Sequence, residues 1–137
     1  MKFGRLGEGF LEQARVWLRM GRRAVKDGNY GFAVLAAQEC VEFSLKGALR
    51  KLGIEHPKFH DVSPVLLLNK ARLPEGLRSN LDRLSEVSRR LAMKRTTAAY
   101  GDEAAGVPPD RIFSRAEAES ALQEASWALK TCAGAKA

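Results

Sequence analysis

Residues 30–52 read YGFAVLAAQECVEFSLKGALRKL, and this stretch decides the fold because its first half is almost continuously apolar or small. Such a pattern suits a helix that is covered by neighbours on several sides. Gly28 and Asn29 precede the stretch, and Gly53 and Pro57 follow it, as is typical at helix ends. We therefore predict a central helix over residues 30–52, around which the rest of the chain packs.

A polar strip interrupts this apolar helix. Gln38, Glu42 and Lys46 recur at four-residue spacing and so share one face, with Glu39 and Arg50 beside them. One interpretation is a solvated strip with a Glu42–Lys46 ion pair, worth about 0.3–0.5 kcal/mol. The other is a buried polar cluster that needs partners, because each unpaired buried polar group costs about 1–3 kcal/mol.

The segments on either side of the central helix also keep helical spacing. Residues 6–27 predict a first helix, and the short turn Asp27-Gly28-Asn29 makes it an antiparallel neighbour of the central one. Further elements predicted along the chain are a short helix over 62–72 with Asp61 before it, a long helix over 75–98, a loop over 99–113, and a last helix opened by the capping box Ser114-Arg115-Ala116-Glu117.

No run of alternating β-forming residues interrupts this series of helices. We therefore predict an all-α, up-and-down bundle of four long helices plus one short helix, folded as a single domain over residues 1–137.

Composition narrows the class of protein. The formal net charge of +7 favours an anionic partner, first of all nucleotide or RNA. No run of about 18 apolar residues is present, so we expect no membrane association. The start of the chain lacks the apolar core of a signal peptide, and the chain has only two cysteines, which predicts a cytoplasmic protein with buried thiols.

Two basic clusters could bind an anion. The first lies near the end of the fourth predicted helix, before Tyr100, whose ring could stack on a base; its members are Arg89, Arg90, Lys94 and Arg95. The second follows the outer face of the first helix and consists of Arg15, Arg19, Arg22, Arg23 and Lys26. A solvated outer face is the alternative interpretation of this second cluster.

Both histidines, His56 and His60, lie in the loop after the central helix. No Cys, Asp or Glu cluster near them completes a metal site, and no Glu-x-x-His motif occurs, so we predict neither metal nor cofactor. For His60 we expect a hydrogen bond within its loop or to the incoming helix end.

The sequence resembles the HEPN domain family, the higher eukaryotes and prokaryotes nucleotide-binding domain. The resemblance rests on A-x-x-A-A-Q-E-C-x-E-x-x-x-K-G from Ala33 to Gly47, then His60-Asp61, then Tyr100-Gly101-Asp102. It covers nearly the whole chain. It implies a helical bundle, a homodimer, nucleotide or RNA binding, and a nucleotidyltransferase partner protein in a toxin–antitoxin-like system. From the basic cluster and the polar strip, we predict the nucleotide- or RNA-binding residues to be Arg89, Arg90, Lys94, Arg95 and Tyr100, with Gln38, Glu42 and Lys46.

Some members of that family are RNases with Arg-x(4–6)-His near the end of the penultimate long helix. Here Arg95 is followed at that spacing by Tyr100, and a phenol with a pKa of about 10 is a poor acid or base at neutral pH. We therefore expect a module that is non-catalytic alone. The alternative is a metal-independent endoribonuclease, for which Arg95, Tyr100 and Glu42 are the candidate catalytic residues.

Two further interpretations stay open. Arg50 and His56 also satisfy the Arg-x(4–6)-His pattern, but they bridge a helix end and a turn, and we interpret the match as coincidence. A helical interaction module whose charge only aids solubility is the third functional class. The narrow apolar stripe from Leu77 to Leu91, together with the small residues of the last helix, independently predicts a homodimer.

Overall fold

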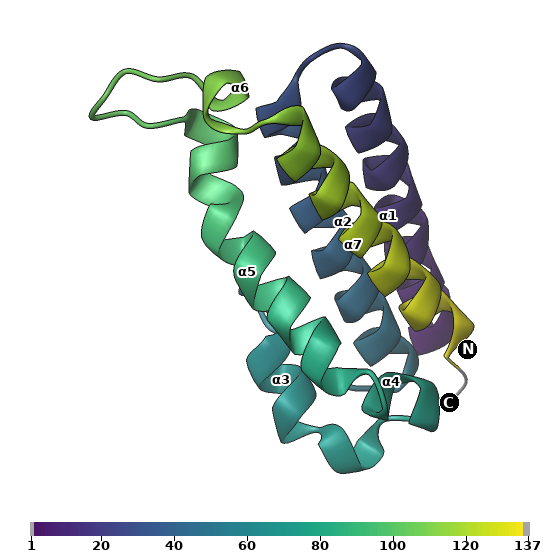
Figure 1. The fold of residues 1–137 in the computed structure, drawn as a ribbon. Coiled ribbons are helices and arrows are strands. Elements are labelled where there is room, and N and C mark those ends of the chain that lie inside the picture. The colour runs from purple at the N-terminus through teal and green to yellow at the C-terminus, as the bar shows by residue number, and fades with distance from the viewer. Residues whose placement is uncertain (1, 136–137) are drawn as a thin grey trace.

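The computed structural model describes residues 2–135. All regular elements named within that range are helices, which confirms the predicted all-α class (Figure 1). The four long helices are α1 (Lys2–Lys26), α2 (Tyr30–Lys51), α5 (Leu81–Tyr100) and α7 (Arg115–Gly134). The short ones are α3 (Ser63–Leu68), the 3₁₀-helix η1 (Lys70–Arg72), α4 (Glu75–Arg78) and α6 (Pro109–Ile112).

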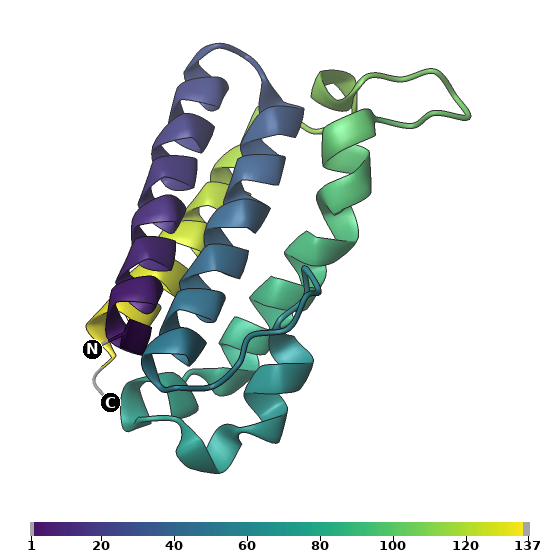
Figure 2. The ribbon, with the colours of Figure 1, turned by 180° about the vertical axis from the view of Figure 1, so that it is seen from behind.

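Helix α2 is the centre of the bundle, as predicted, because it packs against α1, α7 and α5. The long helices alternate in direction along the chain, which gives the up-and-down arrangement (Figures 1 and 2). Cys40 and Cys132 are both buried in the core, and burial raises the pKa of each thiol to about 12.

The apolar stripe of the fourth predicted helix lies inside this core. Leu77, Leu81, Leu84 and Leu91 are buried, as are the small residues of α7 such as Ala125. These surfaces are therefore used within one chain. The stripe and the small-residue face do not support a homodimer, which remains a prediction on other grounds.

Helices α1 and α2 approach each other closely at a pair of glycines. A Cβ atom on Gly7 would lie 2.7 Å from the carbonyl oxygen of Gly47, and a Cβ on Gly47 would lie 2.9 Å from that of Gly7. Both distances are shorter than non-bonded atoms tolerate. The two glycines thus allow backbone-to-backbone packing that any larger residue would push apart.

The predicted helix over 75–98 is wrong in one respect, because it is interrupted. The hydroxyl of Ser79 donates to the carbonyl oxygen of Glu75 at 2.8 Å, and the amide of Asn80 donates to that of Gly76 at 2.8 Å. Such side-chain bonds to backbone carbonyls favour helix ends over helix interiors. They separate α4 from α5 and let α5 take a new direction along α2.

A side-chain bond to a backbone carbonyl also interrupts the short helix predicted over 62–72. There the amide of Asn69 donates to the carbonyl oxygen of Val65 at 2.8 Å, and the chain continues as η1 rather than as one α-helix.

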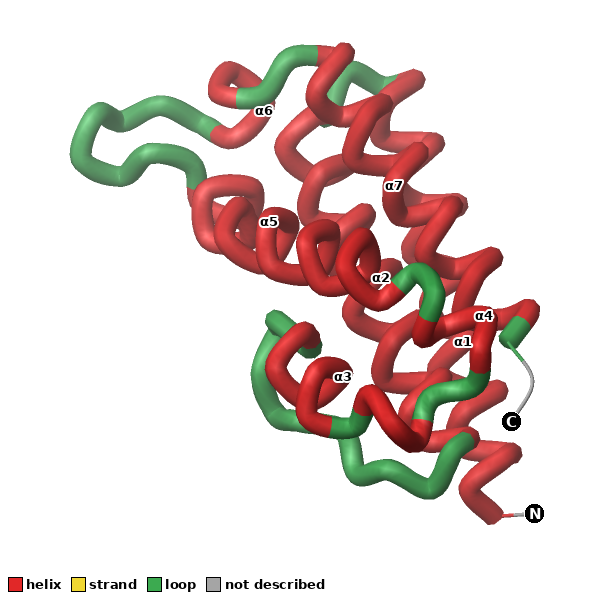
Figure 3. The backbone as a smooth tube through the Cα atoms, turned by 60° about the horizontal axis from the view of Figure 1, so that its bottom comes forward, coloured by secondary structure: helices red, strands yellow, loops and turns green. Residues whose placement is uncertain are grey.

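The segment predicted as a loop over 99–113 is partly helical. Helix α5 continues to Tyr100, and α6 forms within the segment. Between them a single antiparallel bridge joins Asp102 to Val107, and this connection projects from the body of the bundle (Figures 1 and 3). The capping box that opens α7 is confirmed, since Ser114 and Glu117 bond to each other's backbone N–H.

The segment between α2 and α3, residues 52–62, positions the candidate site. It leaves the end of α2 and crosses in front of α5 before α3 begins (Figure 2). Both histidines of the chain lie on this segment, so the fold brings them toward the face where α2 and α5 meet.

Candidate functional site

The polar strip of α2 is buried. Gln38 is 2 % exposed, Glu42 8 % and Lys46 9 %. The interpretation of these residues as a solvated strip is therefore wrong. They form a polar cluster inside the bundle, where each group must find a partner.

Glu42 is the hub of this cluster. Its Oε1 accepts a hydrogen bond from the side-chain amide of Gln38 at 2.9 Å, and its Oε2 accepts one from Nζ of Lys46 at 2.7 Å. The Nδ1 atom of His60 lies 2.8 Å from Oε1. Since a carboxylate only accepts, this contact requires a proton on Nδ1 and leaves Nε2 of the neutral ring able to accept a proton.

Arg95 of α5 is the last member of the cluster and contacts the Gln38 and Glu39 side chains of α2. Its guanidinium donates to the side-chain oxygen of Gln38 at 2.5 Å and forms an ion pair with Glu39. Partial burial lowers the pKa of Arg95, although the group stays charged at neutral pH. A continuous chain of polar contacts thus runs from Arg95 through Gln38 and Glu42 to His60.

A second set of hydrogen bonds fixes the loop that carries His60. The hydroxyl of Ser88 on α5 donates to Oδ1 of Asp61 at 2.9 Å and accepts from the backbone N–H of Val62 at 2.9 Å. Asp61 also accepts from the N–H of Ser63 at 3.0 Å, but the sequence-based expectation that Asp61 is the N-cap of this helix is wrong, because Val62 holds that position. These bonds tie the loop to α5 and hold His60 beside α2.

The sequence analysis named Gln38, Glu42, Lys46 and Arg95 as site residues. It placed Glu39 only beside the strip and His60 only in a loop, and so missed their contacts with Arg95 and Glu42. The expectation that His60 would bond within its loop or to the incoming helix end is wrong, because its partner is Glu42. The one available signal was the order of the motifs, in which His60-Asp61 follows the α2 motif at a short distance.

The statement that no acidic cluster accompanies the histidines is also corrected. One potential ligand atom each from Glu39, Glu42 and His60 lies within 4.8 Å of the others. The spacing of three residues places both carboxylates on one side of α2, and the loop brings the imidazole to them. Lys46 and Arg95 already balance the two carboxylate charges, so an added cation would have to displace them.

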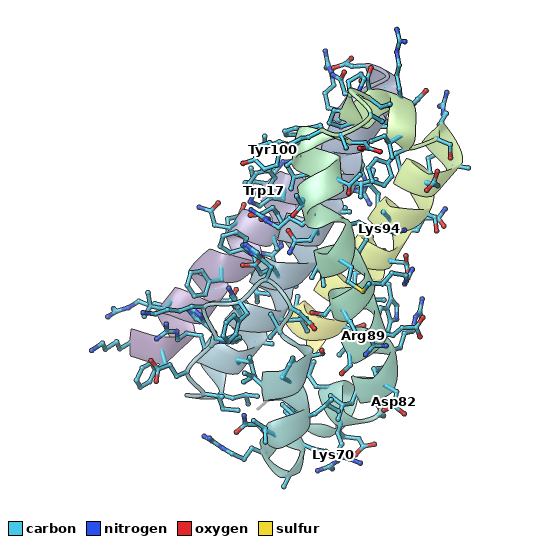
Figure 4. The ribbon with its side chains drawn as sticks, turned by 90° about the vertical axis from the view of Figure 1, so that its left-hand side faces the viewer. Trp17, Lys70, Asp82, Arg89, Lys94 and Tyr100 are labelled. Atoms are coloured by element: carbon cyan, nitrogen blue, oxygen red, sulfur yellow. The ribbon has the colours of Figure 1, made fainter. Side chains whose placement is uncertain are left out.

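The basic side chains predicted to cluster at the end of α5 do not point to one common place. Arg95 turns toward α2, and Arg90 forms a bidentate ion pair with Glu124 of α7. Arg89 and Tyr100 are exposed, and Lys94 is half-buried beside Arg90. Figure 4 shows Arg89, Lys94 and Tyr100 spread along the helix rather than gathered at its end.

Arg50 and His56 take no part in the cluster. The His56 ring packs edge-on against Phe10 of α1, with 5.3 Å between ring centroids, and its Nδ1 lies 3.1 Å from the carbonyl oxygen of Pro57. Arg50 lines a small pocket with Phe3 and Gly53. Neither residue contacts Glu42 or Arg95 through a hydrogen bond in the part of the chain that the structure describes.

The fold and this cluster define a class: an all-helical bundle whose central helix carries a buried polar strip, joined to an arginine of the next long helix. A family model described as HEPN domain matches residues 8–134, so the chain belongs to the HEPN domain family. The chain is also similar to a protein of known structure, TT1696 from Thermus thermophilus, with 30% sequence identity and a TM-score of 0.76.

That alignment covers 93% of this chain and 96% of TT1696. No curated protein matches the chain. Among residues 2–135, no helix is both long and apolar enough to cross a membrane.

Proposed function

We propose that this chain is a nucleotide- or RNA-binding HEPN module that is non-catalytic alone. The observation that supports this most strongly is the polar cluster on α2. A small bundle could fill these positions with apolar residues at lower cost in desolvation, yet here Gln38, Glu42 and Lys46 are buried and bonded. The cluster reaches solvent through the half-exposed side chain of His60 and through Arg95.

In this proposal Arg95 is the phosphate-binding cation. A guanidinium can bond a phosphate through two parallel N–H donors, and a phosphate oxygen would take the place that Glu39 now holds. Arg89 and Lys94 add positive charge along α5, and the exposed ring of Tyr100 offers a face for a base. Arg90 contributes only by leaving its ion pair with Glu124.

The partners in this proposal follow from family membership. We propose that the chain acts in the cytoplasm as a homodimer, with a nucleotidyltransferase partner protein, in a toxin–antitoxin-like system. The two buried thiols agree with a reducing compartment.

The binding proposal is tested by measuring the affinity for a short fluorescent single-stranded RNA at several salt concentrations. Changing Arg90 and Arg95 together to Ala should lower the slope of log affinity against log salt by roughly two, because two phosphate contacts are lost. The matched control changes Lys70 and Arg72 of η1 together to Ala. Both side chains are exposed, and the slope should stay the same. A slope that changes only when Arg15, Arg19 and Arg22 are replaced would move the site to α1.

A second candidate function, a metal-independent endoribonuclease, is favoured by one observation. The contact of His60 with Glu42 orients an imidazole within the cluster that contains Arg95. In such a reaction Nε2 of His60 would take the 2′-OH proton as the 2′ oxygen attacks the phosphorus, and Arg95 would offset charge on the phosphate. The bond from phosphorus to the 5′ oxygen would break, and the leaving oxygen would take a proton from water. This places a better base at the cluster than Tyr100 alone.

The two functions are separated by incubating labelled RNA with the purified protein in the presence of a chelator. The binding proposal predicts intact RNA. Cleavage that disappears in the His60→Ala and Arg95→Ala variants would establish the endoribonuclease instead, and its persistence in Tyr100→Phe would exclude the phenol. Cleavage that survives in all three variants would indicate a contaminating enzyme.

A further inference from the structure

A groove between α1 and α7 lies away from the polar cluster on α2. Its volume is about 650 Å³, which is as large as that of many ligand pockets. Helix α7 faces the viewer in Figure 1, whereas the segment that carries His60 faces the viewer in Figure 2. The groove is therefore a separate feature that the proposed RNA site does not use.

Apolar side chains form the floor of this groove. Val25 of α1 and Leu122 and Trp127 of α7 line it. One face of the Trp127 ring is covered by the guanidinium of Arg83, which lies 3.8 Å from the ring centroid. The floor thus offers aliphatic surface and the remainder of an indole, rather than an open aromatic face on which successive bases could stack.

Cations stand on both walls. Arg22 and Lys26 are one helical turn apart on α1, and Arg22 donates to the hydroxyl of Ser126 on α7 at 3.5 Å. Arg115 and Lys130 mark the two ends of the α7 wall. Fifteen residues separate the latter two, which corresponds to about 22 Å along the helix. The single carboxylate of the lining, Glu119, is bonded to Arg115 at 2.7 Å. Within residues 2–135, no ion pair joins Lys26 or Lys130 to a carboxylate.

We propose that this groove binds an acidic amphipathic helix of a protein partner. A helix of four turns matches the length of the α7 wall and can place an apolar stripe on the floor. Acidic residues on both flanks of that stripe would then face the cations of the two walls. RNA fits less well, because the floor is mainly aliphatic and Arg83 occupies one face of the only aromatic ring that lines it.

The test uses two synthetic peptides of about 18 residues, long enough for five helical turns. The first places Leu at i, i+3, i+4 and i+7 between flanks of Glu. The second has the same composition in an order that scatters the Leu residues around the helix. Binding is measured by calorimetry in about 150 mM salt, which weakens unspecific charge attraction.

The proposal predicts that the amphipathic peptide binds at least about tenfold more tightly than the scrambled one. Changing Lys26 and Lys130 together to Glu should weaken its binding by a similar factor. The matched control, Lys70→Glu with Arg72→Glu, makes the same change in net charge on exposed residues of η1 and should alter affinity less than about twofold. Circular dichroism verifies that each variant is folded.

Three results would overturn the proposal. Equal affinity for both peptides would show that the groove attracts them only by its positive charge. Absence of binding up to about 1 mM peptide would show that the groove does not bind an acidic amphipathic helix. Loss of RNA binding in the Lys26→Glu, Lys130→Glu variant, with RNA binding kept in the Arg90→Ala, Arg95→Ala variant, would make the groove the RNA site. That last result would also refute the α2 site, whereas the first two would leave it untouched.

Discussion

Glu42 is the residue on which the candidate site depends, since it joins Gln38, Lys46 and His60. Changing Glu42 to Gln should destabilise the fold by about 3–5 kcal/mol, because it leaves Lys46 charged and buried without its partner. Chemical denaturation followed by circular dichroism measures this. Adding Lys46→Met should restore part of the loss, since it removes the unpaired charge.

Glu12→Gln is the matched control for that prediction. Glu12 pairs with Arg15 at 3.2 Å on the surface of α1, and loss of such an exposed pair should cost less than about 1 kcal/mol. Equal effects of the two changes would contradict the burial of the α2 cluster.

The two buried thiols make stability depend on alkaline pH. Burial raises the pKa of Cys40 and Cys132 to about 12, whereas an unfolded thiol titrates near 8.5. Between these values the unfolded chain loses protons that the folded chain keeps, so stability should fall as pH rises from about 9 to 12. The slope is at most about 1.4 kcal/mol per pH unit for each thiol.

Denaturation at pH 8, 9.5 and 10.5 measures this fall against the variant in which both cysteines are Ala. Because Lys and Tyr titrate in the same range, the difference between the two proteins is the relevant quantity. A constant difference across these pH values would show that the thiols ionise in the folded protein as they do in the unfolded chain.

At the scale of single residues, the sequence predicted only part of the cluster. Gln38, Glu42 and Lys46 are found by four-residue spacing, because a helix fixes which side chains share a face. The role of Glu39 depends on its contact with Arg95, which lies more than fifty residues later in the sequence. His60 reaches Glu42 only because Ser88 anchors its loop to α5. Such contacts depend on tertiary packing, which local spacing does not encode.

At the scale of elements, α1 and α2 pack closely together at Gly7 and Gly47. Gly47→Ala should destabilise the protein by about 1–3 kcal/mol, because the new methyl group would meet the backbone of Gly7 at 2.9 Å. That cost exceeds the gain of about 1 kcal/mol in helix propensity. Thermal unfolding measures the balance.

Gly9→Ala provides the comparison within α1. A Cβ atom there meets nothing within 4 Å, so this variant should be more stable than wild type by up to about 1 kcal/mol. If Gly47→Ala were also more stable, the helices would not cross at the distance described.

The long helices could be predicted because each has a clear apolar period, and the start of α7 because the capping box is a local signal. The interruptions were missed for an equally physical reason. Ser79, Asn80 and Asn69 are tolerated in helices, and only their side-chain bonds to backbone carbonyls show where the helices end. Apolar spacing continues across these positions and conceals them.

At the scale of the whole molecule, we predict a homodimer. The surfaces that sequence reasoning proposed for it are buried within one chain, but large apolar side chains remain exposed on the loop before α3, on α3 and on α5. Phe59 is 73 % exposed, Leu68 85 % and Met93 78 %, and α3 packs against α5. Light scattering at micromolar concentration should give twice the chain mass of 15.1 kDa.

Changing Leu68 and Met93 together to Glu should yield the monomer without loss of helical content, since both side chains are exposed. Wild-type protein that scatters as a monomer throughout the micromolar range would refute the dimer. A dimer that persists in the double variant would place its interface on another face.

Nuclear magnetic resonance tests whether RNA or nucleotide binds where α2 and α5 meet. The protein is labelled with ¹⁵N and titrated with a short single-stranded RNA, while the His60 ring, the Arg95 side chain and the Trp127 indole are followed. We predict that the His60 and Arg95 signals shift together and saturate, with the Trp127 indole unchanged. Shifts at Trp127 with His60 and Arg95 unaffected would contradict it.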